Sequence, residues 1–177
     1  LQARKNIVKP KGKIFHSVNT NVMLKRSIAA IFRKGFSMER IKVLLIGGLG
    51  YGLLEWCWRG YSHWTMMVTG GICLLVLYEA APRWQGDYLV FRCIKGAILI
   101  TCIELMVGLL VNRTLHWQVW DYSTSPGNLL GQICPLYFLL WYFLCYPLFG
   151  LISFLRKMFQ RRTLTAKEQP VIMKSKG

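Results

Sequence analysis

The chain has 177 residues, of which 54% are hydrophobic, and its mean hydropathy is +0.34. A soluble domain of this size would not carry four long apolar runs, so the composition predicts an integral membrane protein. The net charge of +16 would also suit nucleic acid. Polybasic segments beside a membrane more often meet anionic lipid, and we therefore expect lipid and not nucleic acid at these charges.

The basic residues are concentrated at the two ends of the chain. Residues 1–42 hold eleven of the 23 lysines and arginines, and residues 156–177 hold seven more. Basic flanks face the cytoplasm, so we expect two cytoplasmic basic tails, at residues 1–40 and 156–177, around a transmembrane domain at residues 41–155. No cleavable signal peptide is visible in the first 40 residues.

Within the N-terminal tail, residues 21–40 alternate apolar and basic side chains. This pattern is typical of an amphipathic helix on the inner leaflet, and the alternative is a disordered basic arm. We expect residues 161–177 to be disordered, because they are polar and basic.

Four apolar segments follow one another at residues 41–58, 64–81, 88–111 and 129–155. Each is near the roughly 20 residues that a helix needs to cross the hydrocarbon, so we predict an all-α, polytopic membrane protein with four transmembrane helices. Gly48 and Gly52 form a small-xxx-small pair that favours close helix approach. Pro135 and Pro147 would kink the fourth span.

Acidic residues inside or beside these spans are the first candidates for function. Glu104 is the single charge in residues 96–111, where a carboxylate costs roughly 2.5–3.5 kcal/mol on insertion scales. Glu55 lies near the outer end of the first span, four residues before Arg59, with which it can pair. Asp121 follows the third span in the sequence Trp-Asp-Tyr-Ser.

On the expected topology these polar residues lie at one depth near the outer surface, with Asn128 and Gln132 opening the fourth span. Glu104 then needs a partner on another span, contact with water, or a proton. Structural alternatives are a Glu55 that reaches the outer surface and a protonated Glu104 bonded to a neighbouring helix. The predicted ligand-binding set is Glu55, Glu104, Trp120, Asp121, Tyr122, Asn128 and Gln132.

Other reactive side chains form no recognisable site. No two of the six cysteines form a Cys-x-x-Cys pair, and we interpret them as packing residues. His63 and His116 lack a third ligand at matching spacing, so we expect no metal site. The glycines of the first span are not preceded by a strand, and we expect no cofactor and no catalytic residue.

Residues 117–134 resemble the signature of the bacterial putative ABC-transporter permease family, a CmpB-like group of membrane proteins. In that signature an acid in the preceding helix is followed by Trp-Asp-Tyr-Ser, an Asn and a Gly. The matching positions here are Glu104, Trp120, Asp121, Tyr122, Ser123, Asn128 and Gly131. Gly50, Gly52 and Glu55 resemble the family's opening helix, whereas residues 61–71 lack its Asn-Arg-Gly-Phe-type stretch.

The resemblance implies a bacterial cytoplasmic membrane protein connected with transport. No GxxxxGK[ST] motif occurs, so ATP-driven activity would need a separate subunit. Four helices are also few for a solute path, which implies an oligomer or a partner. We therefore predict a permease-like component that binds a polar or cationic ligand, or a lipid headgroup, at an outer acidic pocket.

Two alternatives remain open. An intramembrane enzyme acting on a lipid-linked substrate would use Glu104 or Asp121 as a general base. A non-catalytic assembly subunit would instead use its basic tails to hold cytoplasmic proteins or anionic lipid.

Overall fold

The computed structural model describes the backbone of residues 37–174 and the side chains of residues 37–161. Nearly all of the predicted N-terminal amphipathic segment, residues 21–36, lies outside the described residues. The described chain forms α2 (Met38–Arg59), α3 (Trp64–Ala80), a 3-10 turn η1 (Ala81–Trp84), α4 (Leu89–Gly108), a π-helical end η2 (Leu109–Thr114) and α5 (Pro135–Lys174). No strand occurs among these elements.

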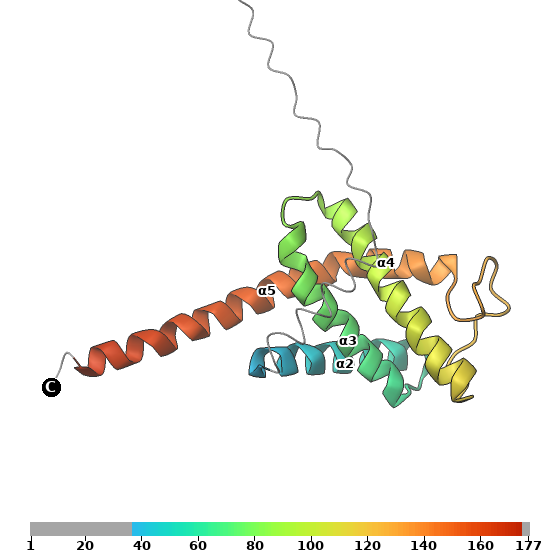
Figure 1. Ribbon diagram of the computed structural model, residues 1–177, viewed down its shortest axis with the longest axis horizontal. Coiled ribbons are helices and arrows are strands. Elements are labelled where there is room, and N and C mark those ends of the chain that lie inside the picture. The colour runs from blue at the N-terminus through green and yellow to red at the C-terminus, as the bar shows by residue number, and fades with distance from the viewer. Residues whose placement is uncertain (1–36, 175–177) are drawn as a thin grey trace, which may run out of the picture.

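The predicted all-α, four-span architecture is confirmed. Within the described residues, four helical stretches are long and apolar enough to cross a membrane: Met38–Arg59, Trp64–Trp84, Leu89–Thr114 and Pro135–Arg161. They alternate in direction, so residues 60–63 and 115–134 lie at one end of the bundle and residues 81–88 at the other (Figure 1). We call the end that carries residues 60–63 and 115–134 the loop end.

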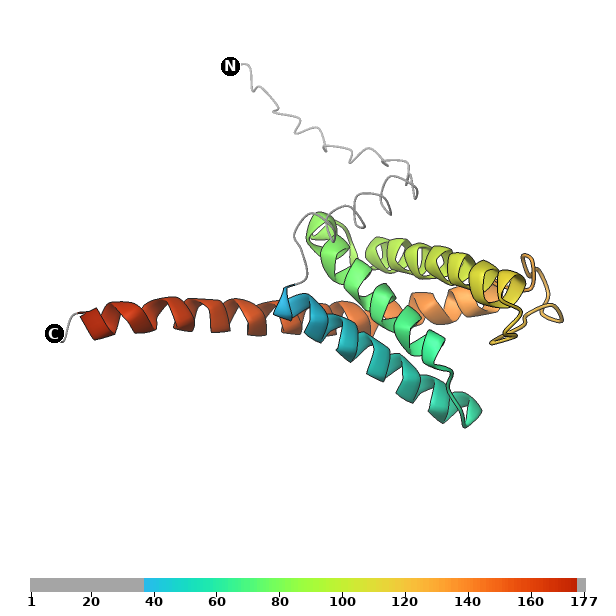
Figure 2. The same cartoon turned by 60° about the horizontal axis from the view of Figure 1, so that its bottom comes forward.

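The fourth span differs from its prediction at both ends. It begins at Pro135, because Leu130 and Gly131 adopt left-handed backbone angles that no helix continues through (φ 56° and 69°). Pro135 therefore occupies the first helical position, where its missing N–H is harmless, and does not kink the span. The predicted disorder is also wrong for residues 162–174, because α5 continues to Lys174 and projects beyond the other helices (Figures 1 and 2).

Close glycine contacts pack α2 along α3. A Cβ atom added to Gly47 would lie 2.6 Å from the Leu74 Cβ, and one on Gly71 would lie 2.6 Å from the Leu44 carbonyl oxygen. On Gly48 it would lie 2.8 Å from the Met67 oxygen. The predicted role of the first-span glycines in close helix approach is thus confirmed at these positions.

The other helices surround α3, which is the most buried of the four. In the most apolar part of each span, 72% of the residues of α3 are buried, compared with 22% for α2 and for α5. α5 packs along α4, where Gly96 admits the Cys145 sulfur. The fold is therefore two helical hairpins, α2–α3 and α4–α5, whose outer members α2 and α5 keep broad apolar faces exposed.

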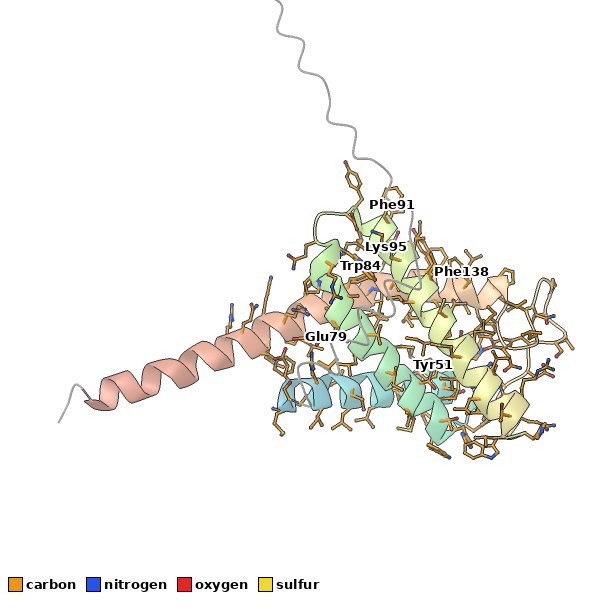
Figure 3. All side chains as sticks on the ribbon, in the orientation of Figure 1. Tyr51, Glu79, Trp84, Phe91, Lys95 and Phe138 are labelled. Atoms are coloured by element: carbon orange, nitrogen blue, oxygen red, sulfur yellow. The ribbon has the colours of Figure 1, made fainter. Side chains whose placement is uncertain are left out.

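One ion pair and one cation–π contact join the helices at the end opposite the loop end. Glu79, near the end of α3, accepts a hydrogen bond of 2.7 Å from the Arg40 guanidinium at the start of α2 (Figure 3). Arg156 of α5 stacks over the Tyr78 ring at 4.2 Å and donates to the Tyr78 carbonyl. These contacts hold α2, α3 and α5 together where their apolar packing ends.

Candidate functional site

Glu104 lies inside the bundle, on the face of α4 that meets α5. It is 3% exposed, and its Oε2 accepts a hydrogen bond of 2.7 Å from the Trp141 indole Nε1 of α5. Its other oxygen, Oε1, is buried and has no hydrogen-bond partner. The expected partner on another span therefore exists for one oxygen of the carboxyl group and not for the other.

Glu104 borders an apolar cavity of about 130 Å³ between the four helices. Tyr51 of α2, which lies in the interior of the bundle (Figure 3), contacts the Trp141 ring across it, with ring centroids 6.0 Å apart. Aliphatic side chains form most of the remaining wall. The lining consists of Ile46, Gly47, Gly50, Tyr51, Leu54, Thr69, Gly70, Cys73, Leu74, Ile100, Glu104, Trp141, Leu144, Leu148 and Leu151.

Asp121 lies in a separate, polar depression of about 410 Å³ on the loop end. Its Oδ1 accepts hydrogen bonds from the Ser123 hydroxyl and from the Ser123 backbone N–H at 2.8 Å. These two bonds lower the pKa of the Asp121 carboxyl below its ordinary value. The depression is lined by Arg59, Tyr61, Gln118, Val119, Trp120, Asp121, Tyr122, Ser125 and Tyr137.

Glu55 is held in a local ion pair. It is 7% exposed, lies 3.5 Å from the Arg59 guanidinium and accepts a hydrogen bond of 2.6 Å from the Ser62 hydroxyl. The pairing with Arg59 predicted from the i,i+4 spacing is confirmed. Both partners of this pair precede α3, so it orders the turn at the loop end.

Three of the predicted ligand residues hold the loop together. The Trp120 indole, 4% exposed, donates to the Gln132 carbonyl at 3.0 Å. The Gln132 side-chain oxygen accepts from Asn112 at 2.8 Å. Asn128 donates to the Ser123 and Ser125 carbonyls at 3.0 and 2.9 Å. Asn128 and Gln132 therefore belong to the loop before α5 and do not open that helix.

A stack of aromatic rings connects the depression to the cavity. Tyr122 stacks on Tyr137 with centroids 4.3 Å apart, and Tyr137 meets Trp141 at 6.3 Å. Burial, followed by the charge of Glu104, raises the pKa of the Tyr122 hydroxyl, which keeps it protonated. This stack lies between Asp121 and Glu104, so the two acids face different spaces.

The predicted site residues thus divide into groups. Glu104 lines the cavity, Trp120, Asp121 and Tyr122 line the depression, and Glu55, Asn128 and Gln132 line neither of these spaces. Sequence reasoning missed Trp141, which looked like one more apolar residue in a span. Its indole N–H was the available signal, since a buried indole usually has a hydrogen-bond partner.

Residues 61–173, more than half of the chain, match the model of a protein family described as "Putative ABC-transporter type IV". No curated protein and no solved structure matches the chain. The family match agrees with the four apolar helices and with the resemblance of residues 117–134. The chain belongs to this family, and it is a membrane protein related to transport.

Proposed function

We propose that this protein is a permease-like component that binds the polar or cationic group of a ligand, or a lipid headgroup, at Glu104. The observation that carries the proposal is the unpartnered Oε1 of this buried carboxyl group, which borders an apolar cavity. A buried polar atom without a partner costs about 1–3 kcal/mol, and native structures keep few of them.

A ligand with an N–H or O–H donor would remove that cost. If the donor is a cation, the hydrogen bond is charge-assisted and roughly twice as strong as a neutral one. The apolar wall around Glu104 strengthens such a bond, because the local dielectric is low. Trp141 holds the carboxyl group through Oε2 and leaves Oε1 for the ligand.

The depression at the loop end lies outside the aromatic stack and can gather cationic ligands near the site. The bias of the basic residues supports an orientation with the loop end on the outer side of a bacterial cytoplasmic membrane and both termini in the cytoplasm. Asp121 is exposed there, where its ionised carboxylate attracts cations. The Tyr122 ring, stacked on Tyr137, is the first part of the aromatic column that leads inward.

The small number of spans implies partners for this protein. A solute path would need further helices, from a second copy or from another subunit, and ATP hydrolysis would need a separate subunit. The basic tails favour contact with anionic lipid at the cytoplasmic surface.

Native mass spectrometry of the gently purified protein tests the proposal. Wild-type protein should retain a bound molecule, and Glu104→Gln, which keeps the shape of the side chain, should lose at least nine-tenths of it. Asp87→Asn, which removes a carboxylate at the opposite end of the bundle and outside both linings, is the matched control and should retain most of it. Equal retention by wild type and Glu104→Gln would rule out the site.

A further inference from the structure

The cavity at Glu104 lies between α2 and α5, which belong to different hairpins and touch through Tyr51 and Trp141. α2 packs on α3 and α5 packs on α4, and the two separate toward the loop end in both views (Figures 1 and 2). Two lining residues of α2, Ile46 and Leu54, are 36% and 52% exposed. The cavity therefore continues into a groove between α2 and α5 that is open to the lipid.

The groove is long and narrow and has one polar end. Its α2 wall runs from Ile46 to Leu54, eight residues or roughly 12 Å at the helical rise, and its α5 wall runs from Trp141 to Leu151, roughly 15 Å. Glu104 and its partner Trp141 lie at the end nearer the loops. Leu148 and Leu151 continue the wall away from them, with no charged side chain among the lining residues there.

Gly50 provides an independent observation. Cβ atoms added to its neighbours Gly48 and Gly52 would lie 2.8 and 2.9 Å from Met67, so those glycines are needed for helix packing. A Cβ added to Gly50 would meet nothing within 4 Å, although Gly50 lines the groove. Packing between α2 and α3 does not require this glycine, and its effect is to keep the groove wide.

We infer that the ligand is a single-chain amphiphile from the bilayer, with a hydrogen-bond donor in its head at the Oε1 of Glu104 and its hydrocarbon chain in the groove beside Gly50. This inference rests on the proposed function and specifies its ligand. An apolar cavity of about 150 Å³ holds one benzene molecule, so the 130 Å³ beside Glu104 admits a small head or a short chain segment, and a longer chain must extend along the groove.

The polarity of the groove matches an amphiphile along its length. The head lies where the free carboxyl oxygen is, and the chain replaces bilayer lipid along the leucines of α5. The head needs a donor, because the Oε1 of an ionised Glu104 accepts a hydrogen bond. A long-chain amine fits, whereas a long-chain carboxylate places an acceptor opposite Oε1.

The test uses hexadecylamine with a diazirine in its chain, in phosphatidylcholine vesicles that contain the full chain. After irradiation, mass spectrometry maps the labelled residues, which should include Leu144 or Leu148. Gly50→Leu should reduce this labelling at least fivefold, because the new side chain fills the groove. Gly150→Leu is the matched control: a Cβ there also meets nothing within 4 Å, but Gly150 lies outside the cavity lining. Its labelling should stay within twofold of wild type.

Leu54→Trp repeats the test at an exposed residue of the groove wall, where no glycine is replaced. Thermal unfolding of each variant shows that it is folded. Excess unlabelled hexadecylamine should compete with the probe, whereas butylamine, a head without a chain, and hexadecanoate should not. Competition by butylamine alone would show that a soluble amine is the ligand and would overturn the inference.

The two proposals fail separately. If folded Gly50→Leu and Leu54→Trp are labelled as strongly as the wild type while Glu104→Gln loses the labelling, the hydrocarbon chain does not lie in the groove. That result would leave the proposed head site at Glu104 standing. Unchanged labelling in all three variants would reject both.

Discussion

The hydrogen bond between Trp141 and Glu104 is the contact on which the site depends, and its strength can be measured. Trp141→Phe removes the indole donor and leaves both oxygens of a carboxyl group that is 3% exposed without a partner. Glu104→Leu removes the acceptor, and the double variant removes both. The four proteins form a double-mutant cycle that isolates the energy of this pair.

Hydrogen bonds between membrane helices average about 0.6 kcal/mol in such cycles, with a maximum near 1.7 kcal/mol. We expect about 1.5 kcal/mol here, because the acceptor is a buried carboxyl group with good geometry at 2.7 Å. Trp141→Phe alone should destabilise the protein by about 1–3 kcal/mol.

Reversible unfolding in bicelles, followed by the fluorescence of the other tryptophans, measures each free energy of unfolding. Phe138→Leu, a change on the same helix without a polar partner, is the control and should show no coupling to Glu104→Leu. A coupling energy for Trp141 and Glu104 below about 0.3 kcal/mol would refute the reasoning, since the bond would then not hold the carboxyl group in place.

Three further predictions concern the loop end and the packing of α2. Asn112→Ala removes bonds to the Trp120 carbonyl, the Gln132 side chain and the Val119 N–H, at 3.0, 2.8 and 2.7 Å, and should increase amide exchange of residues 115–134 at least tenfold; unchanged exchange would show that the loop is held by other contacts. Gly47→Val should destabilise the protein by about 1–3 kcal/mol, because its Cβ would lie 2.6 Å from that of Leu74, and a melting temperature equal to that of Gly50→Val would contradict this difference between the two glycines. The pKa of the Asp121 carboxyl is depressed, so the contribution of Asp121 to loop order is present above its ordinary pKa of 3.8 and is lost as the pH falls through the lower folded pKa. Amide exchange at Ser123, corrected for intrinsic exchange, should therefore rise in that acidic range in the wild type. In Asp121→Asn the same corrected exchange should not depend on pH.

Much of the architecture follows from local sequence. Apolar runs long enough to cross a bilayer predict the four spans. Backbone N–H and C=O groups that are left unpaired in lipid are costly, and a helix pairs them within the run itself. The pair Glu55–Arg59 follows from the geometry of a single helix, because residues four apart lie on the same face. The close approach at Gly48 agrees with the small-xxx-small pattern of the sequence, since only a glycine lets the facing backbone of α3 come so near.

The arrangement of the acids was decided by tertiary structure. Sequence places Glu104, Asp121 and Glu55 near one depth, but depth says nothing of the direction in which each side chain points. The rotation of α4 turns Glu104 toward Trp141 and the cavity, while the folded loop keeps Asp121 at the surface. The start of α5 depends on the loop in the same way, because the left-handed Gly131 donates its backbone N–H to the Asn128 side chain and its carbonyl accepts from the Tyr122 N–H. Hydropathy, which averages over all directions around a helix, carries no information on that rotation, and so the groove beside Gly50 is visible only once the helices are packed.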